Sequence, residues 1–540
     1  MARPSLSTLD GSSFDVAVIG AGVNGSSAAQ HLAAAGYSVL LIDKTDFGAA
    51  TSSRSGRLIG NGMRYLAFGK SPWAFLSHPL QFLDSCKMAK GALADRANMA
   101  LKTPERLNNH LTYYPIYRDD KYKPWQYDVA ALLLKALGTG GVNLSYKRYG
   151  REEALAMPLI RDLRETDKLL GVTRFDSFQF NWPERVVMDA VFNTRDLGAT
   201  VRNYTRLVAM ERSGEKGWRL GLRDEAGAGA GATAHVSARI VLNMAGPWID
   251  AVNRLASDRA SRKVTGTKGV YMAVQLPPDC RGKLVAAMSR EDDPFLAIPW
   301  DDLHYIGPSE TLFEGSVDDV VPDESDLAWL IEEARHVFPG LALTRSDVIY
   351  AWAGVRPLTN KSSAPKGARS RVFHDLSADG LPGVYALTGG PLTTHRTAGA
   401  EACQTVKRVL KPSSSEKTLS FSPRNFPSEP GSALLDPGIP GVTVADLRYA
   451  ALHEFPETLT DLLFRRVRVG WSRDLGYAAA QDAAVAVADI MGWNEDRVRS
   501  EVAAYRDNLR HLYLYSPQNV QAPGDRERIA SKGTRKTKAQ

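Results

Sequence analysis

The hydrophobic pattern at the start of the chain predicts a strand, a helix and a second strand in close succession. A short apolar run covers residues 16–19, an alanine-rich amphipathic segment covers 26–35, and a second apolar run covers 38–42. The first run ends at a glycine and the second ends at Asp43. This order of periodicities is typical of a strand–turn–helix–strand unit.

Three glycines join the first strand to the helix. Gly20, Gly22 and Gly25 have the G-x-G-x-x-G spacing. The first permits a tight turn, the second lets the backbone approach a pyrophosphate, and the third lets the helix pack closely on the strand. The helix N-terminus offers free N–H groups to phosphates, and Asp43 is placed to accept hydrogen bonds from ribose hydroxyls. The unit therefore predicts a dinucleotide site, and its position near the start of the chain favours resident FAD over NAD.

The rest of the chain alternates between helical and strand periods and ends in helices. We expect helices at 128–137, 151–160, 185–193, 324–337 and 393–410, and a helical region from 444 to 514. We expect strands at 173–181, 199–204, 205–212, 217–225, 235–246, 268–276, 283–289, 294–310, 347–358 and 383–386. Residues 411–440 are rich in proline and serine, which is typical of a linker or a wrapped loop.

Composition limits the classes of protein that this chain can represent. With 540 residues it has room for three or four domains, at about 150 residues each, or for fewer large ones. The formal net charge of +7 suits an anionic substrate or an anionic membrane surface, but it does not favour a nucleic-acid partner.

Cysteine usage and hydropathy indicate a compartment. The three cysteines, Cys86, Cys280 and Cys403, are too few and too scattered for a disulfide framework or a zinc site, so we expect no metal. A reducing, cytoplasmic compartment is the simplest interpretation. The sequence has no apolar run of about 18 residues and no signal-peptide pattern.

Five further stretches share a family pattern and occur in the family's order. They are ATSSRSGRLIGNGMRYL (50–66), AGPWIDAV (245–252), WAGVRPL (352–358), GGPLTTHRTAGAEA (389–402) and TLTDLLFRRVRVGW (458–471). With the glycine fingerprint, they resemble the FAD-dependent glycerol-3-phosphate dehydrogenase family, within the D-amino-acid-oxidase-like flavoproteins. The resemblance extends over nearly the whole chain.

The pattern and the resemblance together imply an α/β fold. We expect a Rossmann-like FAD-binding domain of the glutathione-reductase type, a mixed β-sheet substrate domain and a C-terminal all-helical cap. The expected organisation is a disordered lead-in at 1–13, an FAD-binding domain (about 14–70, 180–262 and 380–410) interleaved with a substrate domain (about 71–179 and 263–379), a linker at 411–440, a helical domain at 441–520 and a basic disordered tail at 521–540.

The fingerprint and the matched stretches supply the residues expected to contact FAD. These are Gly20, Gly22, Val23, Asn24, Gly25, Asp43, Lys44, Thr51, Ser52, Ser53, Arg57, Leu58, Asn61, Leu207, Val208, Ala245, Gly246, Trp248, Gly354, Arg356, Gly389, Gly390, Leu392, Thr393 and Thr394. For Leu207 and Val208, contact with the adenine and simple core packing are equally good interpretations. In the resembled group, the helix that begins near Thr393 points its N-terminus at the flavin carbonyl edge.

The substrate side requires a base and groups that hold the substrate. Arg64 and Arg356 match arginines that serve the substrate in the family, and Tyr65 and Thr393 complete the expected contacts. The planar fork of arginine suits an oxyanion, although either arginine could instead anchor a loop. Flavin oxidation of an alcohol also needs a proton acceptor, for which His395, His304 and Tyr271 are the candidates beside Arg356.

Several substrate-side positions depart from the family pattern. Asn61 stands where the family has part of a histidine-glycine-glycine run, Pro391 replaces a lysine, and Tyr271 replaces a histidine. Pro391 removes a phosphate-binding ammonium and cannot donate a backbone N–H. We therefore expect a retained flavin scaffold with an altered pocket, and glycerol 3-phosphate is left open as the substrate.

Three functions remain open from the sequence. The first is an FAD-dependent dehydrogenase or oxidase that moves a hydride from a secondary alcohol of a small anionic polyol, phosphorylated or not, to flavin N5, with quinone or oxygen as the electron acceptor. The second is an amine or amino-acid oxidase, and the third is a flavin-binding protein without catalysis. The segment 71–125 either packs on the flavin domain or meets a membrane surface, where its apolar residues and Lys87 would sit among headgroups. The oligomeric state is not predicted.

Overall fold

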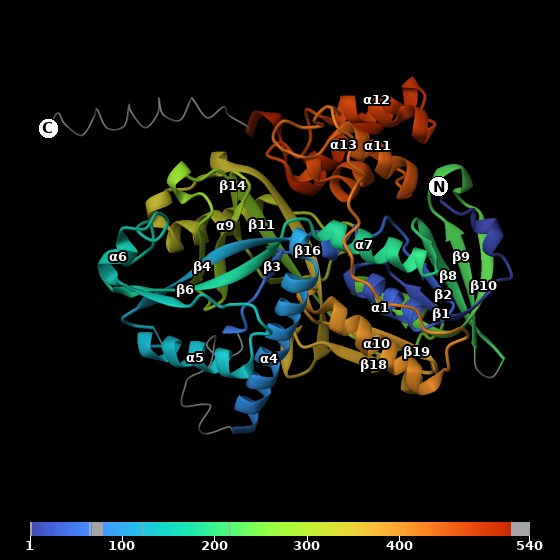
Figure 1. The fold of residues 1–540 in the computed structure, drawn as a ribbon, viewed down its shortest axis with the longest axis horizontal. Helices are drawn as coiled ribbons and strands as arrows, with labels where there is room; N and C mark the ends of the chain where they lie inside the picture. Colours follow the sequence, from blue (N-terminus) through green and yellow to red (C-terminus); the bar gives the residue numbers. More distant parts are fainter. Residues whose placement is uncertain (1–2, 64–65, 67–78, 121, 215–216, 520–540) are drawn as a thin grey trace.

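Two large β-sheets organise the chain, and the strands of each come from widely separated stretches (Figure 1). The computed structural model describes residues 3–63, 66, 79–120, 122–214 and 217–519. The first sheet has the order β18-β19-β10-β1-β2-β7, and β9 and β8 extend it from β10. Its strands are β1 (Ser13–Ile19), β2 (Val39–Ile42), β7 (Thr200–Arg202), β8 (Thr205–Ser213), β9 (Gly217–Asp224), β10 (Thr233–Asn243), β18 (Val372–Asp375) and β19 (Val384–Thr388).

The centre of this sheet is parallel, as a dinucleotide-binding fold requires. β1 lies between β2 and β10, and β7 and β19 extend the parallel set on either side. The helices α1 (Val23–Ala34), α7 (Pro183–Asp196) and α10 (His395–Val409) pack together, with α1 between the other two. Every residue of β2 is buried, which is why it reads as a continuous apolar run.

The second sheet is larger and mostly antiparallel. Its order is β17-β16-β11-β14-β13-β12-β4-β6-β3, with β15 beside β11 and β5 beside β6. The strands are β3 (Leu58–Ile59), β4 (Leu107–Tyr117), β5 (Lys147–Gly150), β6 (Leu169–Phe180), β11 (Val264–Val274), β12 (Leu284–Met288), β13 (Pro294–Trp300), β14 (Leu303–Gly307), β15 (Thr311–Leu312), β16 (Val348–Lys361) and β17 (Ala364–Ala368). Its helices are α4 (Pro79–Lys102), α5 (Pro124–Leu137), α6 (Arg151–Leu155) and α9 (Glu324–Val337).

The C-terminal helices share a core with the second sheet. They are α11 (Val444–His453), α12 (Ala480–Met491) and α13 (Glu495–Tyr513), with a short α8 (Ile249–Arg254) elsewhere on the first sheet. Part of the expected helix at 458–471 is instead a π-helical turn at Asp461–Arg466. Trp471 from this domain joins Trp300 and Trp352 of the sheet in one buried cluster. The domain is therefore anchored to the sheet by a common core.

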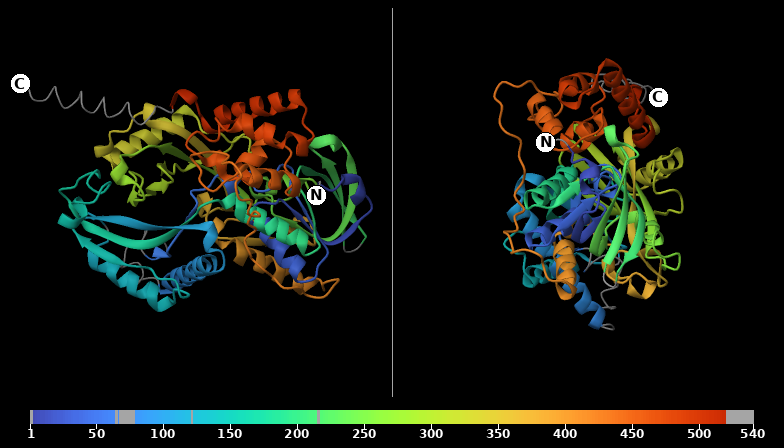
Figure 2. Two further views of the ribbon diagram at one scale, coloured as in Figure 1. Left: turned by 45° about the horizontal axis from the view of Figure 1, so that its top comes forward. Right: turned by 90° about the vertical axis from the view of Figure 1, so that its right-hand side faces the viewer.

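The stretch between α10 and α11 runs along the side of the molecule as a wrapped loop (Figure 2). Ser414 and Lys417 donate backbone hydrogen bonds to Gly36 and Ala34 at the end of α1. Gln30 of α1 donates to the carbonyl of Ser420. The segment is thus held against α1 along part of its length.

The expectation of a disordered lead-in is wrong for residues 3–13. Leu6 and Leu9 lie in a 3₁₀ turn and are buried in the core of the first sheet. Arg3 forms ion pairs with Asp224 at 2.8 Å and Glu457 at 2.9 Å. Two leucines three residues apart give this short segment an apolar face. The segment is too short for a periodic pattern, so the sequence did not predict its burial. The expected basic tail falls outside the described residues.

Candidate functional site

A cavity of about 1470 Å³ is bounded by residues of both sheets. It exceeds the roughly 300–1,000 Å³ of common small-molecule pockets, so it has room for a large cofactor together with a substrate. The residues expected to contact FAD that line it are Gly20, Gly22, Val23, Asn24, Asp43, Lys44, Thr51, Ser52, Arg57, Leu58, Asn61, Leu207, Val208, Ala245, Gly246, Trp248, Arg356, Gly389, Gly390, Leu392, Thr393 and Thr394.

The turn between β1 and α1 forms a cradle that fits a pyrophosphate. Gly20 has a φ of 101°, and a Cβ there would lie 2.7 Å from the carbonyl oxygen of Met244. A Cβ on Gly22 would lie 3.1 Å from Oγ of Ser52. The backbone N–H of Val23 donates to the same Oγ at 3.0 Å, at the start of α1. Small residues thus leave the helix N-terminus open toward the cavity, as an anion requires.

Three of the expected FAD contacts have a supporting position instead. A Cβ on Gly25 would lie 1.9 Å from the carbonyl oxygen of Gly20, so this glycine permits the close approach of helix and turn. Ser53 donates its hydroxyl to the carbonyl oxygen of Gly48. A Cβ on Gly354 would lie 2.7 Å from the carbonyl oxygen of Arg54. The three residues therefore shape the turn and the loop behind the cavity. They do not line the cavity, although FAD contacts were expected of them.

Asp43 lines the cavity at the end of β2. Its Oδ2 accepts from the N–H of Ala21 at 2.8 Å, and its Oδ1 accepts from the N–H of Thr45 at 3.0 Å. Burial raises the pKa of Asp43, and these hydrogen bonds oppose the rise. Oδ1 also accepts from the hydroxyl of Thr45, so Oδ2 is the oxygen with lone-pair capacity left for a further donor. The ammonium of Lys44 lies 4.1 Å from the centre of the Trp248 ring and closes this end.

Arg356 on β16 and Tyr271 on β11 line the cavity on the side of the second sheet. Nη1 of Arg356 is buried and has no hydrogen-bond partner among the described residues. A Cβ on Gly269 would lie 2.5 Å from Nη2 of Arg356. The absence of a side chain at Gly269 therefore provides the space that the guanidinium occupies. Burial lowers the pKa of Arg356, and Tyr271 acts in the opposite direction. The Tyr271 ring stacks on Trp352 with centroids 5.4 Å apart.

The histidine candidates for the base do not line this cavity. His395 is buried at the start of α10, where its Nδ1 lies 2.9 Å from the carbonyl oxygen of Leu392. Burial lowers its pKa to about 3, so the ring is neutral. The helix begins at His395, and the turn of the chain there directs Thr393 and Thr394 to the cavity while His395 packs inside the protein.

His304 occupies the opposite face of the second sheet from Tyr271. It pairs directly with Val274, which belongs to the apolar cluster on the α9 side, whereas Tyr271 belongs to the cluster shared with the C-terminal domain. Its Nε2 lies 3.3 Å from the carbonyl oxygen of Lys283, and burial lowers its pKa to about 4. Strand alternation therefore excludes His304 from the site. Arg64 and Tyr65 fall outside the described residues.

Several charged residues that line the cavity were missed in the sequence. Arg369 pairs with Glu310, and Arg371 pairs with Glu401 at 2.9 Å. Arg369 and Arg371 lie between β17 and β18, whereas Glu310 lies just before β15 and Glu401 lies on α10. Only the folded structure brings each pair together. Glu291 and Asp293 line the same cavity.

Comparison with known proteins is consistent with this geometry. A family model described as FAD dependent oxidoreductase matches residues 15–405, and one described as C-terminal domain of alpha-glycerophosphate oxidase matches residues 430–498. The chain is 25% identical to glycerol-3-phosphate dehydrogenase of Synechocystis sp., covering 93% of this chain and 97% of that protein. It is 27% identical to D-erythritol 1-phosphate dehydrogenase of Brucella abortus, covering 83% and 80%.

A solved structure shares the fold. The glycerol-3-phosphate dehydrogenase from Bacillus halodurans complexed with FAD superposes with a TM-score of 0.67 at 18% identity, over 94% of this chain and 96% of that one. The family resemblance, the fold class and the FAD cofactor expected from the sequence are therefore confirmed. With its glycine cradle, the Asp43 carboxylate at the end of β2 and a family match over most of its length, the chain belongs to the FAD-dependent oxidoreductase family.

Proposed function

We propose that this enzyme oxidises the secondary alcohol of a small polyol phosphate and passes the electrons to a membrane quinone. The observation that carries the proposal is the guanidinium of Arg356, whose Nη1 is buried at the cavity wall without a hydrogen-bond partner among the residues described. The relatives named glycerol-3-phosphate dehydrogenase and D-erythritol 1-phosphate dehydrogenase support a polyol phosphate as the substrate class.

Arg356 supplies the phosphate contact in this proposal. A desolvated guanidinium N–H without an acceptor is costly, and a phosphate oxygen would satisfy it with a charge-assisted hydrogen bond. Arg369 lines the same cavity, and its positive charge lowers the pKa of Arg356. Arg369 is already paired with Glu310. Arg356 therefore has a guanidinium N–H left for the substrate.

Tyr271 accepts the proton of the substrate hydroxyl in this proposal. Its hydroxyl lies against the backbone at Gly56, where a Cβ would come within 2.1 Å of Oη, and the residue lines the cavity. The neighbouring Arg356 cation favours the ionised phenol, because an opposite charge nearby stabilises the charged form. FAD, when bound, supplies the hydride acceptor at N5. Thr393 and Asn61 line the cavity as well and complete the substrate wall.

Anaerobic reduction of the purified yellow protein tests the substrate class. The panel contains glycerol 3-phosphate, erythritol 1-phosphate, the two unphosphorylated polyols and amino acids. Bleaching by a polyol phosphate alone is the expected result. Bleaching by unphosphorylated polyols at equal concentration would overturn the role of phosphate. Bleaching by an amino acid with release of ammonia would favour an amine oxidase, and no bleaching at all would favour a binding protein without catalysis.

Two variants test the roles of the residues. Arg356→Met should raise KM for the polyol phosphate strongly with FAD retained, because it removes the anion contact. Arg371→Met is the matched control, since that arginine lines the same cavity but is already paired with Glu401. Tyr271→Phe should lower the rate constant of flavin reduction with little change in substrate affinity. An unchanged reduction rate would remove Tyr271 as the base.

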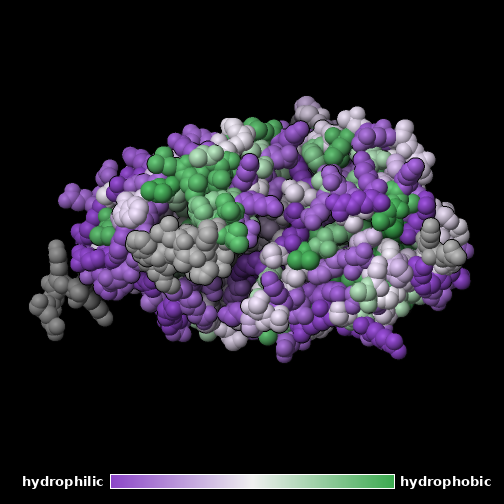
Figure 3. Space-filling model, turned by 90° about the horizontal axis from the view of Figure 1, so that it is seen from below, coloured by the Kyte–Doolittle hydropathy of each residue, from purple (hydrophilic) through white to green (hydrophobic). Residues whose placement is uncertain are grey.

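An exposed apolar patch beside the cavity supports the membrane acceptor. It comprises Leu80, Leu83 and Met88 of α4 and Trp125, Val129 and Leu132 of α5, which are all exposed. Figure 3 shows apolar residues gathered on this face next to a hollow. Lys87 and Met88 line the cavity, so the patch reaches its edge. Such a patch with a lysine beside it suits the headgroup layer of a bilayer.

Vesicle binding tests the membrane proposal. Among the described helices, none has the length and hydrophobicity to cross a bilayer, so attachment would be peripheral. Leu83→Glu with Leu132→Glu should abolish co-sedimentation with anionic phospholipid vesicles and slow reoxidation by a vesicle-embedded quinone. Leu434→Glu, on an exposed leucine of the C-terminal part, is the control. Equal vesicle binding by all three proteins would contradict the patch, and reoxidation by oxygen at the same rate as by quinone would assign oxygen as acceptor.

A further inference from the structure

The loop that follows Asp43 has two different sides. Thr45, Gly48 and Ala49 line the cofactor cavity. Asp46, between them, is 1% exposed and does not line the cavity. One short loop therefore faces FAD on one side and the protein interior on the other.

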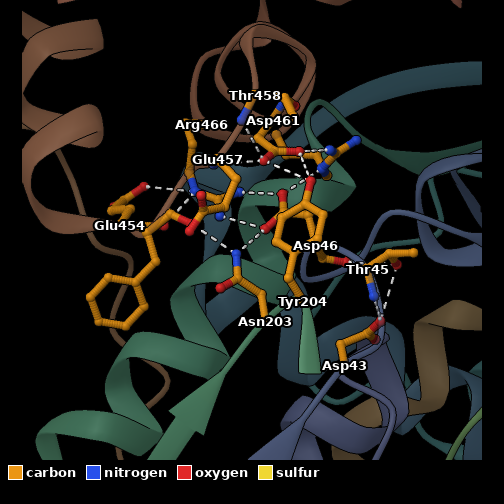
Figure 4. Close-up of polar contacts among 12 residues, drawn as sticks. Asp43, Thr45, Asp46, Asn203, Tyr204, Glu454, Glu457, Thr458, Asp461 and Arg466 are labelled. Carbon is orange, nitrogen blue, oxygen red and sulfur yellow. Dashed lines mark hydrogen bonds and ion pairs between the residues drawn. The ribbon is translucent and has the colours of Figure 1, made fainter. Parts of the chain in front are cut away.

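Two arginines of the C-terminal domain bind the inward side of this loop. Arg466 donates from Nη1 to Oδ2 of Asp46 at 2.9 Å and from Nη2 to Oδ1 at 2.7 Å, a bidentate pair. Arg465 donates from Nε to Oδ2 at 2.6 Å. Both arginines belong to the π-helical turn Asp461–Arg466, more than four hundred positions away in the chain. Figure 4 shows Asp46 and Arg466 facing each other across the domain boundary.

A second path joins the same loop to the same turn. The backbone N–H of Tyr204 donates to the carbonyl oxygen of Thr45 at 2.8 Å. The hydroxyl of Tyr204 donates to both carboxylate oxygens of Asp461, at 2.8 and 2.9 Å. Thr45 in turn donates from its N–H and its hydroxyl to Oδ1 of Asp43. The ribose-facing carboxylate is thus connected to the C-terminal domain through an unbroken series of hydrogen bonds (Figure 4).

The pairing is strong enough to decide the position of the loop. Burial would raise the pKa of Asp46, but Arg466 and Arg465 outweigh that effect and lower it to about 2. A carboxylate this deeply buried cannot rotate out to solvent without breaking all its ionic contacts. Removing one partner of such a pair leaves an uncompensated buried charge.

We propose that Arg465 and Arg466 are positioning residues for FAD, which hold the 44–50 loop in place and so set the affinity for the adenosine half of the cofactor. Neither arginine lines the cavity. Their effect reaches FAD through Asp46, Thr45 and Asp43. Because coupling between two sites is reciprocal, bound FAD also tightens the attachment of the C-terminal domain. The inference rests on FAD binding and is independent of the substrate.

Cofactor affinity of deflavinated protein tests the proposal. Arg466→Met should weaken FAD binding, measured by quenching of flavin fluorescence, by roughly tenfold or more. ADP, which represents the adenosine half, should compete less well by a similar factor. Riboflavin, which lacks that half, should bind as it does to the natural protein. Where Arg466→Met fails to fold, Asp46→Asn removes the charge with little change in shape and should give the same pattern.

Arg185→Met is the matched control at the same boundary. Arg185 pairs with Glu454 at 2.7 Å, is equally buried, and directs its hydrogen bonds to Glu454 and Arg424, not to the 44–50 loop. It should lower the melting temperature without changing the affinities for FAD and ADP. Equal weakening of FAD in Arg185→Met, equal loss of riboflavin, or unchanged FAD and ADP affinity in folded Arg466→Met and Asp46→Asn would each overturn the proposal.

Discussion

The guanidinium carbon of Arg57 lies 3.8 Å from the centre of the Trp471 ring. A residue of the loop along the cofactor cavity thus rests directly on a residue of the C-terminal domain. The Trp300 ring lies on Arg57 as well, at 4.3 Å, and the indole N–H of Trp471 donates to Glu184 at 2.9 Å. Glu184 itself lies 3.8 Å from Nη2 of Arg57. The four side chains form one buried group that joins the second sheet, α7 and the helical domain.

Replacement of the shared indole should be severe. Trp471→Leu removes a fully buried ring, its contact with Arg57 and the hydrogen bond to Glu184, and large-to-small core changes cost about 3–5 kcal/mol. We expect a clear fall in the melting temperature. Trp125→Leu, which changes a residue that is 61% exposed, should leave the melting temperature unchanged. Similar melting temperatures for the two variants would contradict the common core.

His395 should affect stability and not catalysis. His395→Asn should leave the rate constant of flavin reduction unchanged, because the side chain lies outside the cavity. Its pKa falls from 6.5 to about 3 on folding through burial, so the unfolded chain takes up a proton that the folded chain does not. The natural protein should therefore lose stability as the pH falls below 6.5, and the variant should lose less. Urea unfolding at pH 7.5 and pH 5 measures the difference, and a slower flavin reduction would return His395 to the site.

A methyl group opposite Arg356 should disturb substrate binding selectively. In Gly269→Ala the new Cβ would lie 2.5–2.7 Å from the guanidinium of Arg356, which can swing away because it is the end of a flexible side chain. We expect normal FAD content and a raised KM for the substrate. Gly266→Ala, on the same strand and next to Val355, is the control. An unchanged KM in Gly269→Ala would argue against Arg356 as the anion contact.

Two fingerprint glycines should fail in different ways. In Gly25→Ala the Cβ would meet the carbonyl oxygen of Gly20 at 1.9 Å, and backbone must move, so we expect loss of FAD with a lower melting temperature. In Gly22→Ala the Cβ would lie 3.1 Å from Oγ of Ser52, a side chain that can turn. That variant should fold normally and bind FAD more weakly. Spectra and thermal melts of both proteins separate these outcomes, and a normal melt for Gly25→Ala would contradict the close packing.

The parts that the sequence predicted well depend on local chemistry. The bounds of α9 agree with the expected 324–337, because Asp323 caps the helix and accepts from the N–H of Asp326 at 2.9 Å. The cradle around Gly20 and the place of Asp43 likewise follow from one short unit of chain. Local signals of this kind do not depend on contacts with distant parts of the chain, so they can be recognised in the sequence.

The errors concern the directions of side chains and contacts over long separations. His395 is adjacent to two cavity-lining threonines, but one step along a helix turns a side chain by about 100°. The error for His304 comes from the strand register. Its direct partner Val274 faces away from Tyr271, so His304 lies on the opposite face of the sheet. The contact of Arg466 with Asp46 joins positions 420 residues apart, which no periodicity reveals.

The parallel sheet is completed late in the chain. β1 and β2 are made first, but β10 lies between β1 and β19, and β19 spans Val384–Thr388. The arginines that grip Asp46 follow later still. During translation, the glycine fingerprint therefore leaves the ribosome long before β10 and β19 exist. A premature stop codon after the fingerprint would release a fragment that carries the glycines but lacks β10 and β19, the strands that complete the parallel sheet.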